Sequence, residues 1–257
     1  MSAGWRWISD GATLFRRNPL ALWPVVAGYW LTLGLASALP LIGLLIAAIL
    51  IPPLAVGTMT ACRESAAKRP VTLLTLYVAF RPPGRDFRIL QRLFALGALH
   101  FALTLLILGL ASLFDGGALF RVVTGAQTLV DAAGQPGVQS AANIALLFTA
   151  PLTMAFWFAP VLVAWHDLTI AKAVVFSFVA CWRNWKPFIA YGLGLMFISL
   201  LVVALVGQFA LGLGMLQATG PLLTILFLLV LAPILFATFY ISYRDVFTAP
   251  PAVDETA

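Results

Sequence analysis

FIAYGLGLMFISLLVVALVGQFA, residues 188–210, contains 23 residues and no charged side chain. A helix needs about 20 mostly apolar residues to cross the hydrocarbon core of a bilayer. A segment of this kind crosses as a helix because hydrocarbon cannot satisfy unpaired backbone groups. The whole chain has the same character: 62% of its residues are hydrophobic and 9% are charged, against about 45–50% and about 25% in soluble domains. The sequence therefore predicts a membrane protein.

Five further segments meet the same criterion for a membrane span and also lack charged residues. They are residues 20–39, 41–61, 93–113, 141–164 and 221–243. None of them has the alternating pattern of a barrel strand. The predicted fold class is all-α, a polytopic membrane helix bundle with six transmembrane helices and short interfacial cytoplasmic helices. We predict a single six-span membrane domain over residues 1–245 and a disordered cytoplasmic tail over residues 246–257.

The basic residues predict the orientation of the six spans. Fourteen of the fifteen Lys and Arg residues fall on one predicted side of the membrane, and only Arg121 falls on the other. By the positive-inside rule, the side rich in Lys and Arg is cytoplasmic. We therefore predict a multi-pass protein of the bacterial inner (cytoplasmic) membrane with both termini in the cytoplasm. Residues 114–140 and 211–220 are then predicted to lie outside.

Three segments that precede spans resemble one another. Each can form a short helix, and each ends near an aromatic residue followed by Arg: Phe15-Arg16, Phe80-Arg81 and Trp182-Arg183. The predicted helices cover residues 8–17, 71–81 and 168–182. The spans that follow contain Pro53, Pro160 and Pro233, which remove a backbone donor and bend a helix. These features favour a unit of interfacial helix, straight span and kinked span that is used three times.

The first of these helices has two faces in its predicted register. A helix places its apolar side chains in one stripe when they recur every three or four residues. The polar face is predicted to carry Arg6, Asp10, Thr13 and Arg17, and the apolar face Trp5, Ile8, Ala12 and Phe15.

Basic and aromatic residues gather at the predicted cytoplasmic ends of the helices, most densely in FSFVACWRNWKPF, residues 176–188. Indole rings settle at the headgroup level of a membrane, and Arg and Lys reach phosphates or water. We call the following residues the cytoplasmic rim: Arg16, Arg17, Arg81, Arg85, Arg88, Trp182, Arg183, Trp185 and Lys186. The rim is a candidate site for anionic membrane lipids or a membrane protein partner. Determination of topology alone would also account for these charges. Too few basic residues cluster to form a groove for nucleic acid.

Polar residues inside the predicted spans are few, and no Asp or Glu is among them. A transporter coupled to protons or sodium commonly places a carboxylate within the bilayer. His100, Asn143 and Thr153 are the candidate intramembrane polar residues. They either hydrogen-bond neighbouring helices or line the path of a solute.

The chain carries no motif that predicts a reaction, a cofactor or a metal. Phosphate-binding loops, dinucleotide fingerprints and HExxH are absent from the sequence. Cys62 and Cys181 share no spacing with each other or with a His that would suggest a zinc site or a disulfide. His166-Asp167 is interpreted as a helix start. The sequence thus favours a non-enzymatic integral inner-membrane protein, without cofactor, that binds lipid or partner proteins through the rim. A small-solute transporter or channel is the alternative.

WRWISDGATLFRRNPLALW (5–23), AFWFAPVLVAWHD (155–167) and AVVFSFVACWRNWKPF (173–188) resemble an uncharacterised bacterial family of multi-pass inner-membrane proteins. The resemblance covers residues 5 to about 245. Ala-Pro, a short helix and Phe-Ser before Arg-Asn are also distantly similar to the membrane domain of glycerophosphodiester phosphodiesterases. The catalytic barrel of those enzymes has no counterpart in this sequence. The resemblance implies a membrane fold and no reaction.

Overall fold

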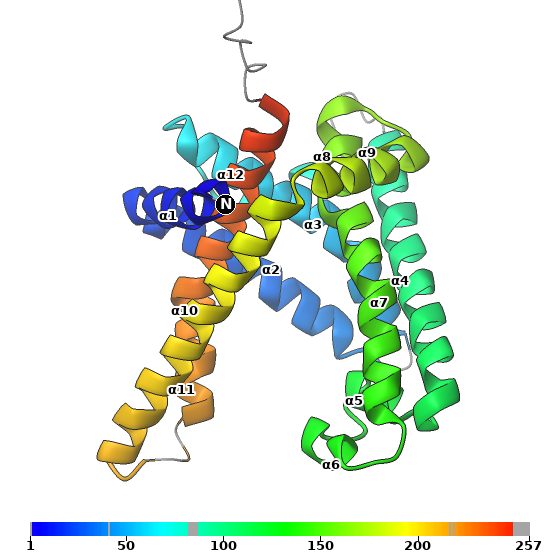
Figure 1. Cartoon of the computed structure of the whole chain (residues 1–257). Coiled ribbons are helices and arrows are strands. Elements are labelled where there is room, and N and C mark those ends of the chain that lie inside the picture. The colour runs from blue at the N-terminus through cyan, green and yellow to red at the C-terminus, as the bar shows by residue number, and fades with distance from the viewer. Residues whose placement is uncertain (1, 41, 82–86, 216, 218, 249–257) are drawn as a thin grey trace, which may run out of the picture. The chain divides into compact units, whose positions relative to one another are not determined.

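The computed structural model describes residues 2–40, 42–81, 87–215, 217 and 219–248 (Figure 1). Within these ranges the chain forms helices and no strands. In chain order the helices are α1 (Ser2–Arg17), α2 (Pro19–Ser37), α3 (Gly43–Ala66), η1 (Leu73–Phe80), α4 (Arg88–Asp115), α5 (Ala118–Val123), α6 (Leu129–Ala133), α7 (Val138–Trp157), α8 (Ala159–His166), α9 (Ile170–Arg183), α10 (Trp185–Gly212), α11 (Thr219–Leu226), η4 (Phe227–Leu231) and α12 (Ala232–Thr248). η1 is a 3₁₀ helix and η4 a π-helix.

Six of these helical segments are long and apolar enough to cross a membrane, which confirms the predicted all-α polytopic bundle. They are α2, α3, α4, α7 with α8, α10, and α11 with η4 and α12. The short helices α1, η1 and α9 lie where the sequence predicts the three interfacial helices. α12 continues to Thr248, three residues into the predicted tail, and residues 249–257 lie outside the described residues. The single membrane domain stays a prediction.

The chain divides into two compact units. Of the described residues, those within 1–34, 54–85 and 182–257 form unit 1, and those within 35–53 and 86–181 form unit 2.

In unit 1, α1 crosses α12 and packs against α10 as well (Figure 1). Two glycines allow this close approach. A Cβ on Gly4 would lie 2.2 Å from the carbonyl oxygen of Pro187, and one on Gly11 would lie 2.4 Å from Cγ2 of Thr238. The first short helix is therefore packed onto two spans along one side.

The buried face of α1 differs from the predicted one. Trp7, Ile8, Leu14 and Phe15 are buried, whereas Trp5 is 55% exposed. The indole Nε1 of Trp7 donates a hydrogen bond of 2.8 Å to the Asp245 carboxylate. The prediction is confirmed for Ile8 and Phe15 and was wrong for Trp5, because the face that the two glycines bring against the spans contains Trp7 and leaves Trp5 exposed.

The 3₁₀ helix η1 packs on α3 in the same unit. A Cβ on Gly57 would lie 1.8 Å from the carbonyl oxygen of Leu76, whose side chain is fully buried. On the α2 side, the hydroxyls of Thr32 and Tyr77 are hydrogen-bonded at 2.7 Å. η1 is thus held by both of the spans that precede it in the chain.

In unit 2, α4 packs along α7 and α8. It also approaches the first half of α3, because a Cβ on Gly97 would lie 2.6 Å from the carbonyl oxygen of Ala48. At the other end of α4, residues 116–137 fold back through α5 and α6. Ala118, Ala132 and Val138 form a small buried cluster there.

Two of the three predicted proline kinks coincide with interruptions of the helix. Before Pro160, α7 ends at Trp157 and α8 begins at Ala159. Before Pro233, five residues adopt the π-helix η4. Pro52 and Pro53 instead lie within the continuous helix α3.

The break before Pro160 holds an inserted side chain. The buried Ser177 hydroxyl of α9 accepts a hydrogen bond of 2.9 Å from the Phe158 N–H and donates one of 2.8 Å to the Met154 carbonyl. In an uninterrupted α-helix these two backbone groups would bond to each other. A side chain inserted in this way is a recognised cause of a helix kink.

Candidate functional site

The rim residues of unit 1 lie at helix ends, where the fold leaves them exposed. Arg16 and Arg17 end α1, Trp182 and Arg183 end α9, and Trp185 and Lys186 begin α10. All six side chains are exposed to at least 36% of their surface. Arg in the last turn of a helix is favourable because that end carries a partial negative charge. Helix geometry therefore accounts for the placement of Arg16, Arg17 and Arg183, while their exposure leaves them open to a ligand.

Four rim cations differ in their surroundings from other basic residues of the chain. Among the described residues, no acidic side chain pairs with Arg16, Arg17, Arg183 or Lys186. Lys186 has an aromatic neighbour instead, and its Nζ lies 5.8 Å from the centroid of the Trp185 ring. By contrast, Arg69 pairs with Glu64 at 3.1 Å, and Arg92 pairs with Asp167 at 2.6 Å. The rim thus carries positive charge that the described protein does not neutralise.

The other predicted rim residues are described only in part. Arg81 is exposed directly after η1 in unit 1, and Arg88 is exposed at the start of α4 in unit 2. Arg85 lies outside the described residues. The part that these three arginines play in the rim therefore stays a prediction.

Trp7 supports the rim at the start of α10 and was not singled out as a functional residue by the sequence. Its ring centroid lies 5.1 Å from that of Phe188 and 6.0 Å from that of Tyr191, both in edge-to-face geometry. Trp7 is 1% exposed, so α1 fixes the first turns of α10 through a buried aromatic cluster. The recurrence of Gly4, Trp7, Ile8 and Gly11 at three- and four-residue spacing is the signal that could have indicated this face.

The three predicted intramembrane polar residues do not form one cluster. The His100 ring packs edge-to-face on Phe156 with centroids 4.9 Å apart. Asn143 accepts a hydrogen bond of 3.1 Å from Gln139 in the same helix, and Thr153 is exposed. Asn143 and Thr153 lie ten residues apart in α7, which corresponds to about 15 Å along the helix. A solute path lined by all three stays a prediction.

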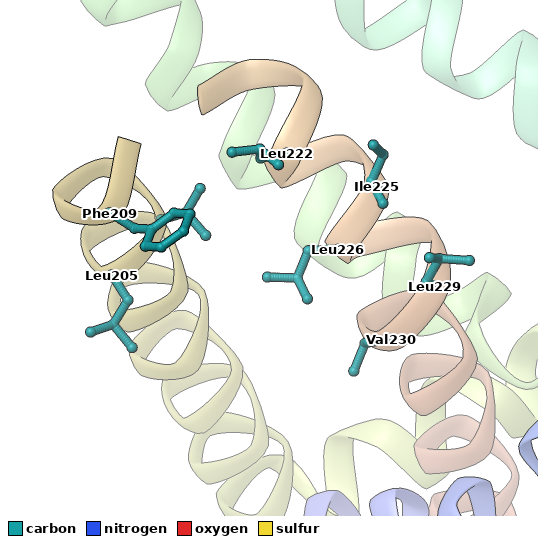
Figure 2. A pocket seen from close by; sticks show the side chains of 8 residues that line it. Leu205, Phe209, Leu222, Ile225, Leu226, Leu229 and Val230 are labelled. Carbon is teal, nitrogen blue, oxygen red and sulfur yellow. The ribbon is translucent and has the colours of Figure 1, made fainter. Parts of the chain in front are cut away.

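A groove of about 530 Å³ lies between α10 and the α11–η4 segment in unit 1 (Figure 2). Its lining contains only hydrocarbon side chains: Leu205, Val206, Phe209, Leu222, Ile225, Leu226, Leu229 and Val230. Such a lining offers no side-chain hydrogen bond to a polar solute. The groove is suited to hydrocarbon, which is the solvent at this depth of a span.

The sequence predicted that His166-Asp167 begins a helix, and this prediction was wrong. Asp167 ends α8 in the left-handed region with φ of 50°, and α9 begins at Ile170. The Arg92 guanidinium donates both to the Asp167 carboxylate at 2.6 Å and to its carbonyl at 3.2 Å. The structure therefore assigns Asp167 to a chain reversal that Arg92 holds, because the left-handed residue terminates the helix.

The two cysteines are buried and free. Burial raises the pKa of the Cys181 thiol to about 12, although a hydrogen bond with Ser177 acts in the opposite direction. Within the described residues, no group of three or more His, Cys, Asp or Glu side chains is placed to hold a metal ion. A thiol that stays protonated is a poor nucleophile and a poor ligand.

A probable inner membrane protein of Burkholderia thailandensis is 40% identical to this chain over 252 residues, which cover 95% of the chain and 90% of the relative. The chain belongs to the family of that inner-membrane protein. Together with the six spans, this establishes a multi-pass integral protein of the bacterial inner membrane. No protein-family model and no solved structure matches this inner-membrane protein. The comparisons show no link to glycerophosphodiester phosphodiesterases, so that distant resemblance stays a prediction.

Proposed function

We propose that this inner-membrane protein is a non-enzymatic protein that binds anionic lipid headgroups through its cytoplasmic rim. One observation carries the proposal. Four cations, Arg16, Arg17, Arg183 and Lys186, are exposed at helix ends and have no acidic partner among the described residues. Lipid phosphates would supply the missing negative charge.

The surrounding side chains suit a membrane surface. Trp182 is 64% exposed and Trp185 is 52% exposed, directly beside Arg183 and Lys186. Indoles partition to the headgroup level, which would place the neighbouring charges close to phosphate oxygens. Each basic residue near an anionic surface is worth about 1 kcal/mol, and the effect falls off within a Debye length.

The packing of α1 supports a binding surface of fixed geometry. α1 carries Arg16 and Arg17, and Trp7 binds it to α12 and α10 through the Asp245 hydrogen bond and the aromatic cluster. Lys186 lies in the first turn of α10, two residues before Phe188 of that cluster. Cations held on packed helix ends lose less freedom on binding than cations on a flexible tail. The predicted cytoplasmic orientation would place them at the leaflet whose surface potential is negative.

The test measures lipids that stay bound to the full chain. The wild-type protein and the quadruple variant Arg16→Gln/Arg17→Gln/Arg183→Gln/Lys186→Gln are extracted into nanodiscs, released, and weighed by native mass spectrometry. We expect adducts of anionic phospholipids on the wild type and their loss in the variant. Because the binding is electrostatic, retention should also fall as ionic strength rises.

A matched control neutralises two cations that already have a partner. Arg63→Gln/Arg69→Gln removes two charges that pair with Glu64 at 3.6 Å and 3.1 Å. We expect this variant to retain the wild-type lipids. Equal retention by the wild type and the rim variant would refute the proposal, and loss of a co-purified protein in place of a lipid would assign the rim to a protein partner.

A further inference from the structure

A second pocket lies in unit 2, between the last turns of α4 and the loop and helix that follow. Its volume is about 560 Å³. Leu105, Leu108, Gly109 and Ser112 of α4 line it together with Gly116, Gly117, Phe120 and Arg121. Leu105, Leu108 and Phe120 give the lining its hydrocarbon side chains, and Ser112 and Arg121 give it polar ones. Leu105 and Ser112 lie seven residues apart, so the part of α4 that lines the pocket extends about 10 Å along the helix.

Arg121 is held in place at this pocket by three neutral acceptors. Its Nε donates to Gln127 Oε1 at 3.0 Å, and its Nη1 donates to the Gly116 carbonyl at 3.1 Å. Its Nη2 contacts Gln135 Oε1 at 3.5 Å. A guanidinium has five N–H donors, so one N–H on each terminal nitrogen has no partner among the described residues. Two unused donors on one guanidinium match the oxygens of a phosphate or carboxylate.

The positive charge of Arg121 has no acidic counterpart within the described residues. Asp115 is the nearest acid in the chain, and both of its carboxylate oxygens accept backbone hydrogen bonds of 2.8 Å, from Gly117 and Leu119. No ion pair of Arg121 occurs in the part of the chain that the structure describes. The pocket therefore combines a fixed, uncompensated cation with a hydrocarbon wall.

The loop around the pocket exposes large apolar side chains, as expected of a surface that touches lipid. Phe120, Val123, Leu129 and Val130 are exposed by 44%, 59%, 64% and 84%. They lie on α5 and α6, at the end of the α4 span that is opposite to Arg88. Apolar side chains at the end of a span favour contact with the headgroup and acyl boundary.

We propose that this pocket, the Arg121 pocket, binds a glycerophospholipid of the surrounding bilayer. The lipid phosphate accepts hydrogen bonds from the two free N–H groups of Arg121. One acyl chain lies along Leu105 and Leu108. This site does not depend on the function proposed for the rim, because it shares no residue with the rim: Arg88, the rim residue of unit 2, begins α4, and the pocket lies at the other end of that helix.

Two variants test the two halves of the site independently. Arg121→Gln removes the charge. Gly109→Leu fills the apolar wall: a Cβ at Gly109 has no atom within 4 Å, so the larger side chain enters open space without a clash. Arg121→Gln also removes the hydrogen bonds of Arg121 to Gln127, Gly116 and Gln135, so it could loosen α5 and α6. Gly109→Leu leaves those hydrogen bonds in place and therefore tests the pocket by itself.

The full chain in nanodiscs of phosphatidylglycerol and phosphatidylethanolamine is released and weighed by native mass spectrometry. We expect one phospholipid adduct that persists in the rim quadruple variant and falls about tenfold in Arg121→Gln, as for lost charge-assisted hydrogen bonds. Gly109→Leu should lose the same adduct and keep the wild-type unfolding temperature.

Four results would overturn the proposal. The first is an adduct that survives in both Arg121→Gln and Gly109→Leu. The second is an adduct that is lost in Arg121→Gln and unchanged in Gly109→Leu. The third is displacement of the adduct by excess inorganic phosphate, which would make free phosphate the ligand. The fourth is loss of the adduct in the rim variant, which would place the lipid on the rim and leave the function proposed there intact.

Discussion

Ser177 provides a direct test of how a broken span is stabilised. Its hydroxyl accepts from the Phe158 N–H at 2.9 Å and donates to the Met154 carbonyl at 2.8 Å. Ser177 and Phe158 are both fully buried. Ser177→Ala removes one oxygen atom and leaves two backbone groups without their partner in an apolar surrounding.

The magnitude follows from those two groups. Each buried donor or acceptor that loses its partner costs about 1–3 kcal/mol. Part of this cost is recoverable, because Phe158 N–H and Met154 C=O are a helical i, i−4 pair that could bond directly if α7 and α8 straightened. Straightening would in turn disturb the buried residues of α8, from Ala159 to Val163. We therefore expect Ser177→Ala to lower the free energy of unfolding by about 2 kcal/mol.

The assay is reversible unfolding of the full chain in mixed micelles of a mild detergent and SDS. Ser199→Ala in α10 is the matched control: it makes the same substitution, and Ser199 is exposed and has no hydrogen bond among the described residues. A change within about 0.5 kcal/mol is expected for the control. Equal unfolding curves for the two variants would refute the reasoning, because they would show that the hydroxyl does not hold the break.

Two further predictions concern packing and thiol chemistry. Gly11→Ala would place a Cβ 2.4–2.9 Å from side-chain and backbone atoms of Thr238, so it should lower the free energy of unfolding by about 1–3 kcal/mol. Gly192→Ala is the control, because its Cβ meets no atom within 4 Å and should leave the free energy of unfolding unchanged. SDS unfolding curves of the two variants test this prediction. Cys181, whose pKa burial raises to about 12, should stay protonated and resist iodoacetamide at pH 8. Thiolate forms only as the pH approaches that pKa, so peptide mass mapping should find alkylated Cys181 after SDS unfolding and not before; rapid labelling of the folded protein would contradict the burial.

The spans were predictable because lipid imposes a simple rule on them. All six predicted segments lie within the observed spans to within two residues, since apolar length is what a bilayer requires. Which face of each span packs against its neighbours was harder to predict, because a span is apolar both where it faces lipid and where it contacts another helix. Gly57 and Gly97 mark two of the closest helix contacts, yet nothing in their local sequence identifies them among the twenty glycines.

The candidate site was predictable in its chemistry and not in its connections. The rim residues could be named from charge and aromatic content at span ends. Trp7 was missed because its partners, Asp245 and Phe188, are far from it in the chain. The Arg121 pocket was missed for a different reason: Gln127 and Gln135 lie 6 and 14 residues from Arg121, in the turns between α5, α6 and α7, so no helical period relates them to it. Contacts made through turns or between distant segments leave no periodic signal in the sequence.

At two points a neighbouring helix contacts a backbone carbonyl that a proline in a span leaves without its helical donor. Pro233 has no N–H to bond the carbonyl of Leu229, and the indole Nε1 of Trp23 donates to that oxygen instead. Pro52 leaves the carbonyl of Ala48 without its helical donor in the same way. Gly97 has no side chain, so α4 can approach this oxygen closely. In both cases a backbone carbonyl freed by proline is a contact point for a neighbouring helix.

The three short helices contact the kinked spans in a regular order, which supports the predicted repeat. α1 packs on α12 at Thr238, η1 packs on α3 at Gly57, and α9 inserts Ser177 between α7 and α8. If the chain consists of three repeats, the short helices of the second and third repeats, η1 and α9, each contact the proline-containing span of the preceding repeat. The short helix of the first repeat, α1, contacts the proline-containing span of the third. The helix ends also suggest a corrected alignment: α1 ends at Arg17 and α9 at Arg183, so Arg17-Asn18 corresponds to Arg183-Asn184, one residue from the pairing predicted with Phe15-Arg16. In this alignment Gly11 corresponds to Ser177. One position of the short helix would then make the contact with a kinked span in both repeats, through a missing side chain in the first and through an inserted hydroxyl in the third.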